Sequence, residues 1–417
     1  MEAPSSEHCS VCAGEATQAA EWLAKRSQPC APHGLISRQV PESAHGASSN
    51  AARQVAAWVK PLSVVSSHPG RLVDTGPVAS INIEVLPMDD SIFGREDSRG
   101  NWSPTKPVSY GPAFDWPPHP RAFLKWFFGF PGYLLPWNVS YAVAAILIWT
   151  FLTPSLATLQ TFSFRWAGLI LLRNIGLAIL VYGAWHTWLY VWRKQGTAFK
   201  YNRQWPKEGS AAFLFNNQTY DNMFHTLVSG VPIWTAYEVL LLWAYANHIA
   251  PTISFAEHPV GFIALFFLVP FIHEVGFYCG HRLLHWPPLY RVAHSLHHRN
   301  INPGPWSGLS MHPIEHLIYF STVLIFFIIP AHPIHMINLA SRLGLAPAQG
   351  HTGFDRVVVG DETSMDTSYY AHYLHHKYFE VNYSDGMVPL DRWFGSFHDG
   401  TPAAHEAMKA RRLRRGV

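Results

Sequence analysis

Charged residues are scarce in this sequence. Only 14% of the 417 residues are Asp, Glu, Lys or Arg, whereas a typical soluble domain carries roughly a quarter. The net charge is only +3, so the chain lacks the strongly basic character of a nucleic-acid-binding protein, and no such partner is expected. Its four cysteines do not make a disulfide framework. Aromatic residues, at 14%, instead favour a protein that meets lipid.

The first 118 residues are rich in Ala, Ser, Pro and Gly and show no sustained apolar period. This composition predicts a disordered N-terminal tail at 1–118. A region of transmembrane helices is expected to follow at 119–280. It opens with an aromatic segment at 123–137 that suits the membrane interface.

Four long apolar runs predict membrane-spanning helices, because about 20 such residues cross a bilayer. They lie at 139–156, 175–192, 223–246 and 260–280. The basic residues between them are unevenly distributed. The loop between the first two runs has only Arg165, apart from Arg173 at the edge of the second run, and the loop between the last two has none. The loop between the second and third has Arg193, Lys194, Lys200, Arg203 and Lys207. The positive-inside rule therefore places the loop at 193–208, and the chain after residue 280, in the cytosol.

A shorter apolar run at 317–329 is followed by Pro330 and Pro333. Thirteen residues are too few for a crossing and instead predict half of a re-entrant helical hairpin at 314–346. Such a hairpin returns the chain to the side it left, so that His312 and His351 can serve one site. The expected fold is all-α, a multi-pass bundle of about four spans plus this hairpin. A cytosolic, histidine-rich helical cap at 281–400 and a basic tail at 401–417 complete it.

Three histidine clusters stand in the cap, in the sequences HRLLH, HSLHH and HYLHH. Their i, i+3 and i+4 spacings put the imidazoles of each cluster on one face of a helix. Eight histidines are too many for one closed zinc site, which takes four ligands, and they suit two neighbouring metal ions with open positions. Imidazole binds iron, copper, zinc and nickel alike, so the spacing does not select the metal. The predicted catalytic, metal-binding residues are His281, His285, His294, His297, His298, His372, His375 and His376.

Several further residues are candidates for the same site. His312 and His351 are predicted to be additional metal ligands. A group that accepts the outer N–H of a ligating ring fixes its tautomer, and this role is expected of Asp355, Glu315 and Glu274. His316 is expected to be either a metal ligand or an outer partner of one. His273 and Glu238 lie within predicted spans, where an ionisable group often has a functional role. These two residues could equally form one buried polar pair.

Five motifs together resemble the membrane-bound fatty acid hydroxylase/sterol desaturase superfamily. They are HRLLH (281–285), HSLHH (294–298), HPIEH (312–316), HTGFD (351–355) and HYLHH (372–376). The stretch NYSDGMVPLDRWFG at 382–395 is similar to the ending of this superfamily, and the resemblance covers roughly 140–400. HTGFD is most similar to the sterol C-4 methyl oxidases, and the short spacing between the first two boxes is similar to that of the sterol-type members, which include C-5 desaturases.

The resemblance implies an enzyme that holds two iron ions and uses dioxygen. It would take electrons from a carrier such as cytochrome b5 or a ferredoxin, and would hydroxylate or desaturate a C–H bond of a lipid, with a sterol favoured. Fatty acid and sphingolipid hydroxylases of the same superfamily are the alternative. The implied location is the endoplasmic reticulum membrane of a eukaryote or the cytoplasmic membrane of a bacterium, with the site on the cytosolic side.

A histidine-rich membrane metal transporter is a candidate from a different class. Transporters place their ligands near the bilayer midplane on broken spans. Here the clusters follow a span and contain Arg282, Arg291 and Arg299, which belong outside lipid. A scaffold that has lost its metal is also disfavoured, because all eight cluster histidines are present.

Overall fold

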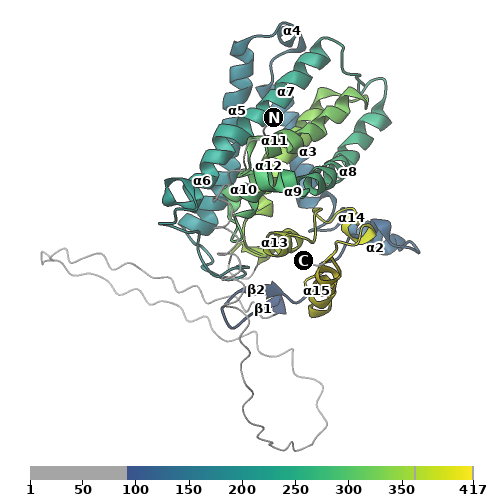
Figure 1. The fold of residues 1–417 in the computed structure, drawn as a ribbon. Helices are drawn as coiled ribbons and strands as arrows, with labels where there is room; N and C mark the ends of the chain where they lie inside the picture. Colours follow the sequence, from purple (N-terminus) through teal and green to yellow (C-terminus); the bar gives the residue numbers. More distant parts are fainter. Residues whose placement is uncertain (1–91, 361–362, 416–417) are drawn as a thin grey trace, which may run out of the picture. The chain divides into compact units, whose positions relative to one another are not determined.

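The computed structural model describes residues 92–360 and 363–415, so most of the predicted tail, residues 1–91, lies outside the described residues. The described part is mostly helical, and its strands form two short antiparallel hairpins. Figure 1 shows the long helices side by side, with the C-terminal elements gathered at one end of the bundle. The expectation of a predominantly α-helical fold is confirmed.

Four helices are long and apolar enough to cross a membrane, as the sequence predicts. They cover Leu134–Leu152, Phe164–Val191, Gln218–Ala246 and Pro259–Leu284. Their main parts are α3 (Val139–Leu152), α5 (Phe164–His186), α6 (Gln218–His225) with α7 (Val231–Ala246), and α8 (Pro259–Leu284); the turns η3 (Leu134–Asn138), η4 (Thr187–Val191) and η6 (Thr226–Gly230) extend them.

The remaining elements connect these helices and build the end that carries the histidines. Ahead of and between the long helices lie β1 (Gly94–Glu96), β2 (Trp102–Pro104), η2 (Pro112–Phe114), α2 (Pro120–Phe128), α4 (Leu156–Leu159) and η5 (Leu214–Asn216). After α8 come α9 (Pro287–Leu289), η7 (Tyr290–His294), α10 (Ser295–His298), η8 (Pro305–Leu309), α11 (Pro313–Phe320), η9 (Ser321–Phe327), α12 (Pro333–Gly350), β3 (Arg356–Val358), β4 (Ser364–Asp366), α13 (Tyr370–Tyr378), α14 (Leu390–Trp393) and α15 (Pro402–Arg415).

The second long helix begins at Phe164 rather than at the predicted 175. The prediction stopped at Arg173 and Asn174 because a charged residue is costly within lipid. Both side chains donate hydrogen bonds to the buried Glu238 carboxylate of α7, so the charge is paired and the helix continues past it. Glu238 therefore pairs with Arg173, and the suggested pairing of Glu238 with His273 is wrong.

The predicted hairpin segment forms two helical arms, α11 with η9 and then α12. The backbone N–H of Ala331, in the turn between the arms, donates to the carbonyl of Pro251 in the loop between α7 and α8. The turn thus lies at the α7–α8 loop. Helix α12 packs against α3, α5, α7 and α8, and Gly344 lies so close to Trp234 that a Cβ there would come within 2.6 Å of the indole ring. Surrounding helices therefore enclose the returning arm.

Residues 94–104 form a small hairpin within the stretch that was predicted to be a disordered tail. Strands β1 and β2 pair antiparallel, and Trp102 is only 2% exposed. Its ring contacts Phe199 with centroids 5.1 Å apart, in a cluster that includes Tyr201 and Tyr373. One large buried side chain contributes enough apolar area to hold a short segment against the domain. A single apolar residue gives no periodic pattern in the sequence, so the segment was not predicted to be ordered. The tail prediction is wrong for this stretch.

We expect Trp102→Ala to destabilise the chain by about 3–5 kcal/mol, the usual cost of truncating a buried large aromatic side chain. The loss should appear as a lower thermal midpoint in detergent. Trp116→Ala is a matched control, because Trp116 is 91% exposed and its removal leaves no cavity. Equal midpoints for the two variants would contradict the packing of the hairpin on the domain.

The basic loop at 193–208 has one buried lysine. Lys200 is fully buried, its ammonium donates to the Asn202 carbonyl at 2.7 Å, and burial lowers its pKa to about 7. Its positive charge is therefore weakened near neutral pH. The exposed basic residues of this loop are Arg193, Lys194, Arg203 and Lys207, and they still outnumber those of the other two loops.

Candidate metal centre

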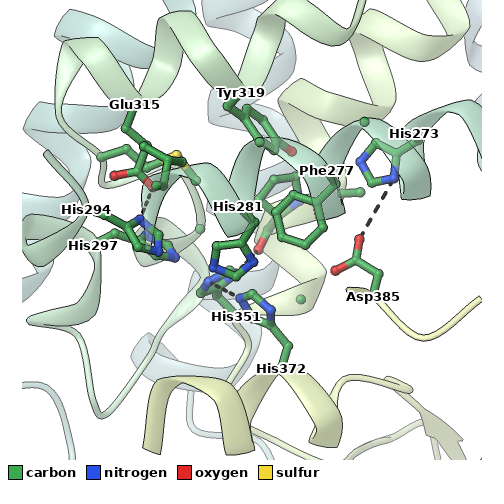
Figure 2. Close-up of a pocket in the computed structure, with 18 of the residues that line it drawn as sticks. His273, Phe277, His281, His294, His297, Glu315, Tyr319, His351, His372 and Asp385 are labelled. Atoms are coloured by element: carbon green, nitrogen blue, oxygen red, sulfur yellow. Dashed lines mark hydrogen bonds and ion pairs between the residues drawn. The ribbon is translucent and has the colours of Figure 1, made fainter. Parts of the chain in front are cut away.

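Nine of the ten predicted ligands come together in two groups at one end of the bundle. Within each group the potential ligand atoms lie within 4.8 Å of one another. The first group is His281, His285, His294, His298 and His375, and the second is His297, His351, His372 and His376. All are buried except His285, which is half-buried. Figure 2 shows His281, His294, His297, His351 and His372 converging at this end of a pocket.

Four helical segments carry these histidines. His281 lies in the last turn of α8 and His285 caps it. His294, His297 and His298 follow on η7 and α10. Helix α13 presents His372, His375 and His376, and His351 is the C-terminal cap of α12.

The Nε2 atoms in each group face one another at short distances. His285 Nε2 lies 3.1 Å from that of His294, 3.1 Å from that of His298 and 3.2 Å from that of His375. In the second group His351 Nε2 lies 3.0 Å from that of His372 and 3.1 Å from that of His376. Two bonds of about 2.0–2.1 Å from one metal ion to nitrogen, at right angles, hold the nitrogens about 3 Å apart. The spacing therefore fits imidazoles around a cation.

The outer nitrogens of four rings have acceptors that determine the tautomer. Each of these acceptors lies 2.7–3.0 Å from Nδ1: the carbonyl of Tyr383 for His281, Glu315 Oε1 for His294, the carbonyl of Pro347 for His351 and the carbonyl of Val381 for His375. A neutral imidazole has one N–H, so donation from Nδ1 leaves the Nε2 lone pair directed into the group. Such outer partners orient metal-ligating histidines.

Burial keeps these rings neutral. It lowers the pKa of His298, His375 and His376 well below the usual value, and neighbouring imidazoles lower it further. Burial acts in the same direction on the pKa of His297 and His372. A neutral imidazole is the form that binds a metal, so the donor set is ready for a cation at physiological pH.

His312 lies outside both groups, contrary to expectation. Pro313 begins α11 and leaves His312 at the N-cap, where its Nδ1 accepts the backbone N–H of Ile314 at 3.2 Å. His316 is buried one turn further on, with Ser229 Oγ 3.0 Å from Nδ1 and the Leu309 carbonyl 3.1 Å from Nε2. These two histidines cap and anchor α11.

Of the acidic residues expected to accept from ligating rings, only Glu315 does so. Asp355 accepts instead from the Tyr201 hydroxyl at 3.1 Å. The Glu274 carboxylate accepts from the backbone N–H groups of Gly386 and Met387. His273 lies in the pocket but faces Asp385, a residue that the sequence analysis did not identify. The carbonyl acceptors were also missed, because a backbone oxygen leaves no signal in the sequence.

The pocket beside the two groups has largely apolar walls. Phe277 and Leu284 of α8, Met311, Tyr319 of α11 and Pro347 of α12 line it, and Figure 2 shows Phe277 between His281 and His273. A cluster of neutral nitrogen donors thus lies beside a largely apolar pocket.

Residues 266–396 match the model of the fatty acid hydroxylase family. This stretch contains both histidine groups. This part of the chain, about a third of its length, is therefore similar to the fatty acid hydroxylase/sterol desaturase superfamily. The resemblance carried by the five motifs is confirmed.

Several fungal proteins are similar to part of this chain. The Delta(7)-sterol 5(6)-desaturase of Aspergillus fumigatus is 30% identical over 167 residues, 34% of this chain and 52% of that protein. The enzyme of the same name from Saccharomyces cerevisiae is 28% identical over 147 residues, 35% of this chain and 39% of that one. The chain therefore spans about half the length, or less, of these relatives. No solved structure matches it.

Proposed function

We propose that this protein is an integral-membrane, non-haem di-iron oxidoreductase that hydroxylates or desaturates a C–H bond of a lipid, with a sterol favoured. The observation that carries the proposal is the pair of adjacent histidine groups at one end of a largely apolar pocket. The relatives described as sterol desaturases support the reaction class and the sterol.

The nine histidines would hold the metals, five around one ion and four around the other. Two iron ions bound there would supply the oxidising power, using dioxygen and electrons from a separate protein such as cytochrome b5 or a ferredoxin. Glu315 holds the ring of His294, and the carbonyls of Tyr383 and Val381 hold those of His281 and His375. Phe277 and Leu284 exclude water and align the lipid chain against the histidines.

The proposed layout keeps the membrane region at 119–280, the catalytic region at 281–400 and the basic tail at 401–417. The helical hairpin at 314–346 leaves and returns on the histidine side, but its turn reaches the α7–α8 loop. In a eukaryote the membrane would be that of the endoplasmic reticulum, and in a bacterium the cytoplasmic membrane. The exposed Arg193, Lys194, Arg203 and Lys207 favour a cytosolic position for the 193–208 loop and for the histidines. Lipid would then enter from the bilayer while the electron donor docks from water.

Topology can be tested by thiol labelling. We expect single cysteines at Lys194 and Glu406 to react with a membrane-impermeant reagent from the cytosolic side, and one at Ala256 to react only from the opposite side. All three positions are exposed, and the native cysteines would first be replaced. Labelling of positions 194 and 406 from opposite sides would refute four crossings followed by a hairpin that returns to the side it left.

The reaction itself can be tested by lipid profiling of cells with and without the gene, with sterols and fatty acids separated. We expect a lipid that carries one more hydroxyl or double bond to disappear with the gene and its precursor to accumulate. Expression of the wild-type chain should restore the product, and His297→Ala should not. His312→Asn is the matched control, because asparagine also caps helices well and His312 lies outside both groups. Restoration by His297→Ala would contradict the proposal.

A further inference from the structure

The pocket has a second polar end, away from the two histidine groups. His273 stands on α8 two turns before His281, and Asp385 approaches it from the loop before α14. His273 Nδ1 lies 3.9 Å from Asp385 Oδ2. This distance is too long for a direct hydrogen bond, so both groups retain hydrogen-bonding capacity within the pocket.

One of these atoms is buried without a partner. His273 is 5% exposed, and its Nε2 makes no hydrogen bond within the described residues. An unsatisfied buried polar group costs stability and calls for an explanation. The side chain lines the pocket, so a ligand held there could supply the missing partner.

The loop that presents Asp385 is firmly anchored. The Glu274 carboxylate accepts from Gly386 N at 3.0 Å and from Met387 N at 3.1 Å. On the other side of Asp385, the Asp391 carboxylate accepts from Tyr383 N and Ser384 N at 2.9 and 2.8 Å. Asp385 is thus held opposite His273 by bonds on both sides, which is the rigidity that a binding subsite requires.

We propose that His273 and Asp385 form a subsite for the hydroxyl group of a neutral lipid alcohol. This inference rests on the proposed function and narrows its substrate class. A hydroxyl both donates and accepts, so it can bond to the unpartnered Nε2 of His273 or bridge its Nδ1 to the Asp385 carboxyl group. No Lys or Arg lines the pocket in the described part of the chain, and a carboxylate or phosphate head buried without a cationic partner is costly. The subsite therefore selects against free fatty acids and acyl phosphates.

The distance between the two ends requires an elongated ligand. Eight residues of helix place the backbones of positions 273 and 281 about 12 Å apart. Phe277 lies between them, with ring centroids 6.1 Å from His273 and 4.9 Å from His281. An apolar body packed on Phe277, with its hydroxyl held at His273, would bring one fixed part of the lipid to the histidine groups. The subsite would thereby set the position of oxidation.

The test is equilibrium binding to the purified full chain with its bound metals, with radiolabelled cholesterol, cholesterol 3-methyl ether and oleate as probes. We expect the wild type to bind cholesterol roughly tenfold tighter than the ether, the effect of about one buried hydrogen bond, and oleate more weakly still. His273→Leu should lower cholesterol affinity roughly tenfold and leave ether affinity unchanged. His273→Gln, which keeps a polar group, should lose less.

His335→Leu is the matched control. His335 is also a fully buried histidine, but it lies on α12 outside the pocket, bonded to the Phe262 carbonyl. It should leave the ratio of cholesterol to ether affinity at the wild-type value. Equal wild-type affinities for cholesterol and its ether, or an equal loss of both in His273→Leu, would overturn the subsite. Metal content measured on the same samples tests the di-iron proposal separately, because His273 is not among the proposed ligands.

Discussion

His375→Ala is expected to remove bound metal and to abolish turnover. His375 is fully buried, and its Nε2 lies 3.2 Å from that of His285 and 3.0 Å from that of His298. The wild-type chain, purified without chelator, should carry about two metal ions if the two groups form one bimetallic site. The variant should lose at least one of them. Its activity should fall by more than about 100-fold, the upper end of the loss caused by removing an outer partner of a ligand.

Metal analysis and turnover on the same preparations would test this expectation. His316→Gln is a suitable control, because glutamine can still bond to Ser229 and the Leu309 carbonyl, and His316 lies outside both groups. It should retain two ions and activity. A chelator should also lower the thermal midpoint of the wild type, since a metal bound only by the folded chain stabilises it. An active His375→Ala variant with two bound ions would refute the assignment.

Glu315→Ala is expected to weaken metal binding or activity by about 10–100-fold, the usual cost of losing a carboxylate behind a ligating histidine. Glu315 is 1% exposed, and its Oε1 accepts from His294 Nδ1 at 2.7 Å. Without it the ring of His294 loses both its orientation and its fixed tautomer. Glu315→Gln should lose less, because an amide oxygen can still accept this bond.

Iron occupancy measured against free iron concentration would separate a weakened site from an unfolded one. Excess iron should restore occupancy in Glu315→Ala if the variant has only lost affinity. Glu406→Ala is the control for removal of a carboxylate, because Glu406 has a side chain 69% exposed and pairs only with Lys409. Unchanged iron affinity in Glu315→Ala would show that His294 does not need its carboxylate partner.

The sequence by itself determined the features that depend on spacing along one segment. The offsets within HRLLH, HSLHH and HYLHH place the imidazoles on one helical face wherever the helix lies, and eight of the nine clustered histidines were recognised in this way. The lengths of the apolar runs likewise determined the four long helices. His351 has no partner histidine at helical spacing, so it was predicted as a ligand only because the three clusters already indicated a metal site.

Only the tertiary structure decided which of these side chains meet. His297 and His298 are neighbours in sequence, yet they belong to different groups, because successive helical residues point about 100° apart and each faces a different partner segment. Packing also places His312 at a helix N-cap, away from both groups. It pairs Arg173 with Glu238 inside the helix bundle, and it buries Trp102 against Phe199. It brought Asp385 to His273 across more than a hundred residues of chain. A residue's position on its own helix is a local property, whereas its contacts depend on how distant segments pack, and neither spacing nor composition encodes that packing.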